Sequence, residues 1–215
     1  MQRIIFNLLL CAACLGGPAG AHPHVFVDAR TGFIFGSDGQ LRALRISWTY
    51  DAFTSLILFD SLNLDEDRDG KLSEADQAAV IAGETNWDPE YKGDVYLEVA
   101  GQDYPLGRPE AAAVTYDDNK VEVSFDLPLS EPVAIGETAA LLRLYDPVFY
   151  YAYTIVPGAD AFELPAGCQA QIVPFEPSAA ENALQERLAT LGLDETPEED
   201  NIGRVFSDEV HLTCG

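Results

Sequence analysis

The chain has 215 residues, of which 36 are Asp or Glu and 12 are Lys or Arg, so its formal charge near neutral pH is −24. This excess of negative charge repels nucleic acid and anionic membrane surfaces, which are both bound through basic patches. We therefore expect no nucleic-acid partner, and cations are the natural small partners of such a surface.

The first residues are typical of a secretory signal. Arg3 gives a short positive region, residues 4–15 are apolar, and Ala19-Gly20-Ala21 is a small-residue cleavage site. We expect residues 1–21 to be removed and the protein to be periplasmic or secreted. The apolar stretch is too short to span a membrane and no later segment has about twenty apolar residues, so an integral membrane protein is not expected.

The remaining residues, 22–215, predict one metal-binding domain that begins with strands. Residues 24–35 alternate loosely and are rich in Val, Phe and Ile, and the turn at 36–39 leads into a second strand over 41–48. The apolar spacing then changes to that of a helix over 51–64.

An acidic loop of twelve residues follows this helix. Asp65, Asp67 and Asp69 occupy loop positions one, three and five, and Gly70 permits the sharp turn at position six. A second helix is expected over 73–83, so the insertion at about 51–83 resembles an EF-hand that binds calcium or magnesium. The predicted ligands are Asp65, Asp67, Asp69, Lys71 (carbonyl), Ser73 and Asp76.

Position twelve departs from the usual EF-hand pattern. It is Asp76, whereas a Glu normally closes the loop with two carboxylate oxygens. The shorter side chain is expected to weaken calcium binding or to admit magnesium. The alternative interpretation is an acidic turn that is merely solvated.

The rest of the chain alternates short strands with turns, which is typical of an antiparallel sandwich. A helix follows, because Ser178 and Glu181 form a capping box and Gly192 ends the apolar stripe. The expected fold is mainly β with helices (α+β): an antiparallel β-sandwich-like domain with the EF-hand-like insertion and a C-terminal helix. Strands are expected over 94–99, 112–116, 120–127, 138–145, 149–156 and 168–174, with a last strand pair over 205–214.

The four cysteines divide into two pairs. Cys11 and Cys14 lie in the predicted signal, where Cys14 offers an alternative lipidation site that a Cys at position 11 disfavours. Cys168 and Cys214 have one possible pairing, and an exported chain meets an oxidising compartment, so we expect a disulfide. The alternative is a thiolate pair that binds a metal.

Cleavage after Ala21 makes His22 the first residue, followed by Pro23 and His24. The terminal amine and two imidazoles on one face of an extended chain bring three nitrogen donors together. Imidazole suits nickel, cobalt, zinc and copper. Pro23 has no amide proton to lose, which excludes the square-planar chelate of an amino terminus with a third-position histidine.

Three further residues are weaker candidates for this transition-metal site. Asp28 lies on the same strand face, and Asp146 precedes Pro147, which favours a turn that presents its carboxylate. His211 completes the site if the final strand lies beside the first. The alternatives are solvated terminal histidines and an ordinary aromatic core strand after the turn.

Together these motifs resemble a bacterial family of exported proteins known as domain of unknown function one-thousand-and-seven. Its members are labelled as periplasmic components of an uncharacterised transport system, often beside nickel/cobalt-type transporters. The resemblance implies a metal-handling role with an inner-membrane transporter, carried by His22, His24 and Asp146. It rests on Ala21-His22-Pro23-His24-Val25-Phe26-Val27-Asp28, Trp48-Thr49-Tyr50-Asp51, Asp146-Pro147 with Tyr150 and Tyr151, and the Cys-terminated end.

The leading hypothesis is a non-catalytic periplasmic protein that captures a transition-metal ion for a membrane transporter, with a calcium-type ion in the acidic loop. A calcium-rigidified structural or adhesive module is the main alternative, and a copper oxidase with a histidine brace is a third. Hydrolase motifs are lacking: the sequence has no Gly-x-Ser-x-Gly elbow, no His-Glu-x-x-His helix and no Gly-rich phosphate loop.

Overall fold

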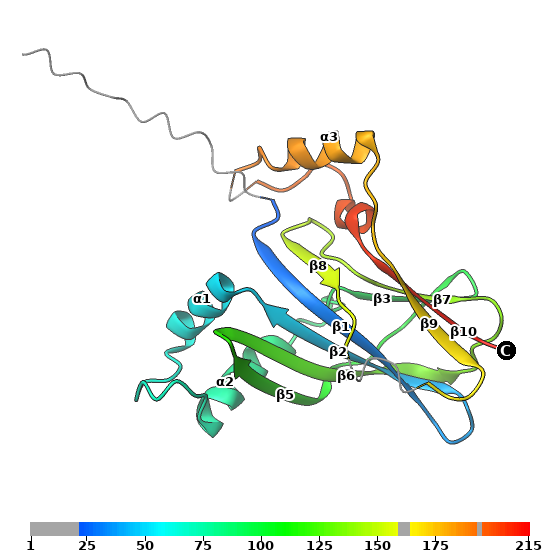
Figure 1. The fold of residues 1–215 in the computed structure, drawn as a ribbon, viewed down its shortest axis with the longest axis horizontal. Coiled ribbons are helices and arrows are strands. Elements are labelled where there is room, and N and C mark those ends of the chain that lie inside the picture. The colour runs from blue at the N-terminus through cyan, green and yellow to red at the C-terminus, as the bar shows by residue number, and fades with distance from the viewer. Residues whose placement is uncertain (1–21, 159–163, 193–194) are drawn as a thin grey trace, which may run out of the picture.

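The computed structural model describes residues 22–158, 164–192 and 195–215, so the predicted signal at 1–21 lies outside the described residues (Figure 1). Strands dominate, as the sequence predicts for a mainly β, α+β protein. The elements are β1 (Val25–Phe35), β2 (Leu41–Tyr50), α1 (Ala52–Leu62), α2 (Glu74–Thr85), β3 (Val95–Val99), β4 (Gln102–Tyr104), β5 (Glu110–Asp117), β6 (Lys120–Val133), β7 (Ala140–Leu144), β8 (Tyr151–Ile155), β9 (Cys168–Val173), α3 (Ala179–Leu188), the 3-10 helix η1 (Ile202–Phe206) and β10 (Glu209–Cys214).

The strands form two five-stranded sheets, ordered β5-β6-β2-β1-β8 and β4-β3-β7-β10-β9. Every pair of neighbouring strands is antiparallel except β1 and β8, which run parallel. Alternate side chains of both sheets meet in one core, to which Ile46 and Phe125 contribute from the first sheet and Leu142 and Leu212 from the second. The β7–β8 connection carries the chain from one sheet to the other.

The two helices α1 and α2 form the inserted hairpin between β2 and β3, at one end of the first sheet (Figure 1). The Asp51 side chain caps α1 by accepting the N–H groups of Phe53 and Thr54, and Ser73 with Asp76 forms a capping box at α2. Among the described residues, no helix has the length and hydropathy needed to cross a bilayer.

The end of the chain differs from the prediction. Residues 202–206 form a 3-10 helix, so the expected strand pair over 205–214 is a single strand, β10. Phe206 of this helix stacks on Phe149, and Ile202 joins Phe149 and Leu188 in a small second cluster under α3. Burial of these side chains, which strand periodicity does not reveal, favours the compact turn over an extended backbone.

The predicted disulfide between Cys168 and Cys214 is confirmed. The two residues face each other across the β9–β10 pair, with their Cα atoms 4.0 Å apart. The bond therefore fastens the final strand to its neighbour at the edge of the second sheet.

Candidate metal centres

The two N-terminal histidines lie side by side at the start of β1. Their ring centroids are 4.9 Å apart, and the Tyr150 ring lies 4.4 Å from that of His24. The parallel pairing of β1 and β8 produces this arrangement, because the N–H groups of His24 and Val25 both donate to the Tyr150 carbonyl, at 2.8 and 3.2 Å. The two rings are therefore adjacent, although residues 22–23 form a bend before β1 and not the extended chain that the sequence predicts.

Each ring has a buried nitrogen with no hydrogen-bond partner in the described part of the chain: Nδ1 of His22 and Nε2 of His24. His22 is only 4% exposed. Burial, reinforced by neighbouring His24, lowers the pKa of His22 below its ordinary value, whereas the charge of Asp146 opposes this shift. The neutral imidazole, which is the form that binds a metal ion, is therefore favoured at neutral pH.

Asp146 lies close enough to His22 to act on its charge, and it also organises the loop beside it. Its carboxylate accepts the backbone N–H groups of Val148 at 3.1 Å, Tyr150 at 2.7 Å and Tyr151 at 3.1 Å. The β7–β8 connection is thereby held in the shape that places Tyr150 against His24. The carboxylate thus both positions this loop and supplies a negative charge to the histidine pair.

A second buried carboxyl, Asp94, lies near Asp146 and was not singled out from the sequence. It is 3% exposed and accepts a hydrogen bond from the Tyr153 hydroxyl at 2.9 Å. Burial, with a further contribution from the charge of Asp146, raises the pKa of Asp94 to about 7. The only signal for this residue in the sequence is its place before a strand, which many surface Asp residues share.

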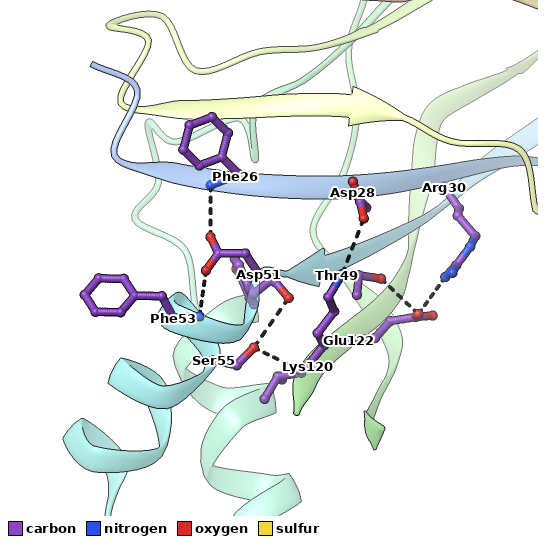
Figure 2. Close-up of polar contacts among 11 residues, drawn as sticks. Phe26, Asp28, Arg30, Thr49, Asp51, Phe53, Ser55, Lys120 and Glu122 are labelled. Atoms are coloured by element: carbon purple, nitrogen blue, oxygen red, sulfur yellow. Dashed lines mark hydrogen bonds and ion pairs between the residues drawn. The ribbon is translucent and has the colours of Figure 1, made fainter. Parts of the chain in front are cut away.

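The two other predicted candidates lie apart from the histidine pair. The final strand β10 pairs with β7 and β9, not with β1, and the His211 ring is engaged at 2.6 Å by Glu209, which also binds Arg143. Asp28 is on the outer face of β1, 3.9 Å from the Lys120 ammonium (Figure 2). The structure does not bring either residue into a cluster with His22 and His24.

The acidic loop between α1 and α2 gathers three of its predicted ligands. Carboxylate oxygens of Asp65, Asp67 and Asp69 all lie within 4.8 Å of one another. One Asp65 oxygen accepts the N–H of Asp69 at 2.9 Å, and Gly70 has the positive φ of +79° that the sharp turn requires. Such a triad of hard oxygen donors fits calcium or magnesium.

The closing residue of the loop has two roles. Asp76 accepts from the Ser73 N–H at 2.8 Å and the Ser73 hydroxyl at 2.7 Å, which completes the capping box of α2. These bonds, together with the backbone N–H of Asp65, lower the pKa of Asp76. The carboxylate therefore lies next to loop position one. Lys71 is exposed, with its ammonium 4.0 Å from Asp69.

The two groups of residues have different donor chemistry. Unpartnered, buried imidazole nitrogens suit a transition-metal ion, because such an ion supplies the missing partner to both rings. Exposed carboxylates suit a hard divalent cation. His22 and His24 would hold the first, and Asp65, Asp67 and Asp69 would hold the second. Among the described residues, Asp146 does not join the two histidines in a group of donor atoms within 4.8 Å of one another, so it acts on them through its charge.

Comparison with known proteins gives two matches. A family model described as "Protein of unknown function (DUF1007)" matches residues 7–214. An uncharacterised protein of Haemophilus influenzae is 24% identical over 197 residues, which cover 90% of this chain and 91% of that protein. The match spans both sheets, the helical insertion and the cysteine-terminated end. The chain therefore belongs to the DUF1007 family.

Proposed function

We propose that this protein is an exported, non-catalytic metal-binding protein that captures a transition-metal ion and assists a membrane metal transporter. His22 and His24 hold the captured ion, and the amine of His22 joins them once the signal is removed. A calcium-type ion in the acidic loop stiffens the α1–α2 hairpin.

The observation that carries this proposal is the pair of buried imidazole nitrogens without partners, His22 Nδ1 and His24 Nε2. A buried polar atom without a hydrogen bond costs about 1–3 kcal/mol, so two neighbouring ones are unfavourable unless something binds them. A single metal ion bound by both rings, whose centroids are 4.9 Å apart, would give both nitrogens a partner. Solvated terminal histidines would instead be exposed, whereas His22 is buried.

The surroundings support capture and release more than catalysis. Tyr150 covers one side of His24, and Asp146 brings a negative charge that favours a bound cation. Nickel, cobalt, zinc and copper all accept imidazole, and the acidic surface attracts any of them from solution. The carboxylate loop has hard oxygen donors, so calcium at that loop leaves the nitrogen site free for the softer ion.

The test is isothermal titration of mature protein beginning at His22 with nickel, cobalt, zinc and copper, under saturating calcium. We expect one equivalent to bind with a sub-micromolar Kd, and the His22→Ala/His24→Ala variant to bind at least about 100-fold more weakly. Because saturating calcium already occupies the acidic loop, the heat measured on adding the transition metal does not come from that loop.

His211→Ala is the matched control, because it removes the third histidine of the chain from the other sheet. It is expected to bind like the parent. Equal, weak binding by the parent and the His22→Ala/His24→Ala variant contradicts the proposal and leaves a protein with a calcium-type loop alone.

A further inference from the structure

Helix α1 presents an apolar face to solvent. Phe53 is 70% exposed, Leu56 66% and Ile57 52%, and Phe26 of β1 is also more than half exposed. Spacings of three and four residues place the three helical side chains on one face. Contiguous apolar surface of this kind marks an interaction site far more often than scattered single residues do.

The helix is anchored so that this face stays outward. Asp51 accepts the N–H groups of Phe26 and Phe53, at 3.4 and 2.8 Å, and so ties the start of α1 to β1 (Figure 2). On the opposite side of the helix, the buried Ser55 hydroxyl accepts the N–H of Val121 in β6 at 2.9 Å. Leu58, Phe59 and Leu62 of the same helix pack against the core. One side of α1 therefore attaches the helix to the domain, and the side with the three exposed apolar residues faces solvent.

A cavity of about 410 Å³ opens beneath this face, between α1, the end of α2 and the starts of β1 and β8. We call it the α1 pocket. Its walls are largely aromatic and aliphatic and include Phe53 and Ile57 of the exposed face, so the pocket and the face form one surface. Its lining residues are His24, Val25, Tyr50, Phe53, Thr54, Ile57, Leu58, Ser61, Glu84, Tyr150 and Tyr151.

One carboxylate lies in this aromatic pocket. Glu84 accepts a hydrogen bond from the buried Tyr50 hydroxyl at 2.6 Å, and it forms no ion pair with any described residue. The lining contains no Lys or Arg. Burial raises the pKa of Glu84, which reflects a carboxylate without a compensating positive charge.

We propose that the α1 pocket binds a lysine or arginine side chain of a partner polypeptide, whose neighbouring apolar residues pack on Phe53, Leu56 and Ile57. The cationic group pairs with Glu84, and the tyrosine rings around it add cation–π attraction. The apolar stem of the basic side chain lies along the pocket walls.

Charge decides this choice of partner. The chain carries a net charge of −24, and an acidic loop follows α1, so a basic segment is attracted and a second copy of this chain is repelled. Anionic lipid is repelled for the same reason. His24 also lines the pocket, which places the docked segment beside the candidate metal site. The inference does not depend on that metal function, and its test runs without transition metal.

The experiment is a titration of ¹⁵N-labelled mature protein, in calcium buffer without transition metal, followed by NMR amide shifts. The probes are acetyl-Leu-Lys-Leu-amide and the same peptide with uncharged norleucine in place of lysine. We expect the lysine peptide to shift amides around Glu84, Tyr150 and Ile57, and to bind about tenfold more tightly than the norleucine peptide. Because this comparison uses the native protein, it does not depend on the folding of a variant.

Glu84→Gln keeps the shape and the hydrogen bond with Tyr50, and is expected to abolish the preference for lysine. Glu186→Gln, the same exchange at an exposed position of α3, is the matched control and should keep it. The proposal is overturned if both peptides bind equally or if the shifts lie outside the α1 pocket. The proposal is also overturned if the protein self-associates or binds phosphatidylcholine vesicles through this face, which loss of that binding in Ile57→Ser would show.

Discussion

At the scale of single residues, the interior of this protein contains polar groups that an ordinary core does not have. The imidazoles of His22 and His24 each leave a nitrogen unpartnered, and Asp94 and Asp146 are buried carboxyls within range of one another. All four residues lie where the β7–β8 connection meets the start of β1 or β3. Their concentration at one place favours a functional site over accidental burial.

Asp94 is expected to make folding stability depend on pH. Its pKa is raised to about 7 in the folded protein, so between pH 4 and 7 the folded state binds more protons than the unfolded state, and stability falls as pH rises. Asp94→Asn has no such group, and Asn tolerates the positive φ of 53° at this position. Urea unfolding should show the variant gaining roughly 2–3 kcal/mol relative to the parent between pH 5 and 8.

The matched control for this measurement is Asp88→Asn, which changes an exposed Asp in the preceding loop. Its stability relative to the parent should stay constant over the same pH range. A pH-independent difference between Asp94→Asn and the parent would show that Asp94 is ionised in both folded and unfolded chains.

At the scale of elements, the helix-loop-helix insertion is expected to respond to calcium. The Asp67 carboxylate is exposed and lies within 4.8 Å of the carboxylates of Asp65 and Asp69. Replacing this side chain therefore tests the loop's metal binding directly. Asp67→Asn is expected to weaken calcium binding by about 10- to 100-fold and so to reduce the calcium-induced rise in Tm at a given calcium concentration. Calorimetric titration and thermal unfolding with and without calcium measure both effects.

The neighbouring Glu66 provides the control, because it occupies loop position two, which supplies no ligand. Glu66→Gln removes the same charge and should leave calcium affinity within about twofold of the parent. Equal losses in the two variants would mean that the loop attracts calcium only through its overall charge.

The disulfide between β9 and β10 leads to a separate prediction about the free energy of unfolding. Cys168 and Cys214 are 46 residues apart, and closing a loop of this length contributes about 2–4 kcal/mol through the entropy of the unfolded chain. A Cys168→Ser/Cys214→Ser variant should lose this amount in urea unfolding, and the reduced parent should match it. An unchanged stability would mean that the ladder and the packing of α3 hold the final strand without the bond.

At the scale of the whole molecule, local patterns predict the elements better than they predict which elements meet. Alternating residues predict β1 and β2, apolar spacing predicts α1, and the capping box at Ser178 predicts α3. The loop ligands Asp65, Asp67 and Asp69 are also local. Each of these features depends on neighbours in the chain.

Contacts between distant segments could not be predicted in the same way. The parallel pairing of β1 and β8 puts Tyr150 on His24, and the assignment of β10 to the other sheet separates His211 from both. Asp94 and Glu84 gain their importance from burial beside residues far along the chain. The sequence therefore predicts the histidine pair, while its surroundings follow from the topology of the sheets.

The most direct test of the proposed metal capture uses the fact that the chain has only three histidines. Mature protein labelled with ¹⁵N at histidine gives one imidazole pattern for each, and one equivalent of zinc is added under saturating calcium. We predict that ring nitrogens of His22 and His24 move to metal-bound shifts while those of His211 stay unchanged. Unchanged shifts at His22 and His24 would contradict the account.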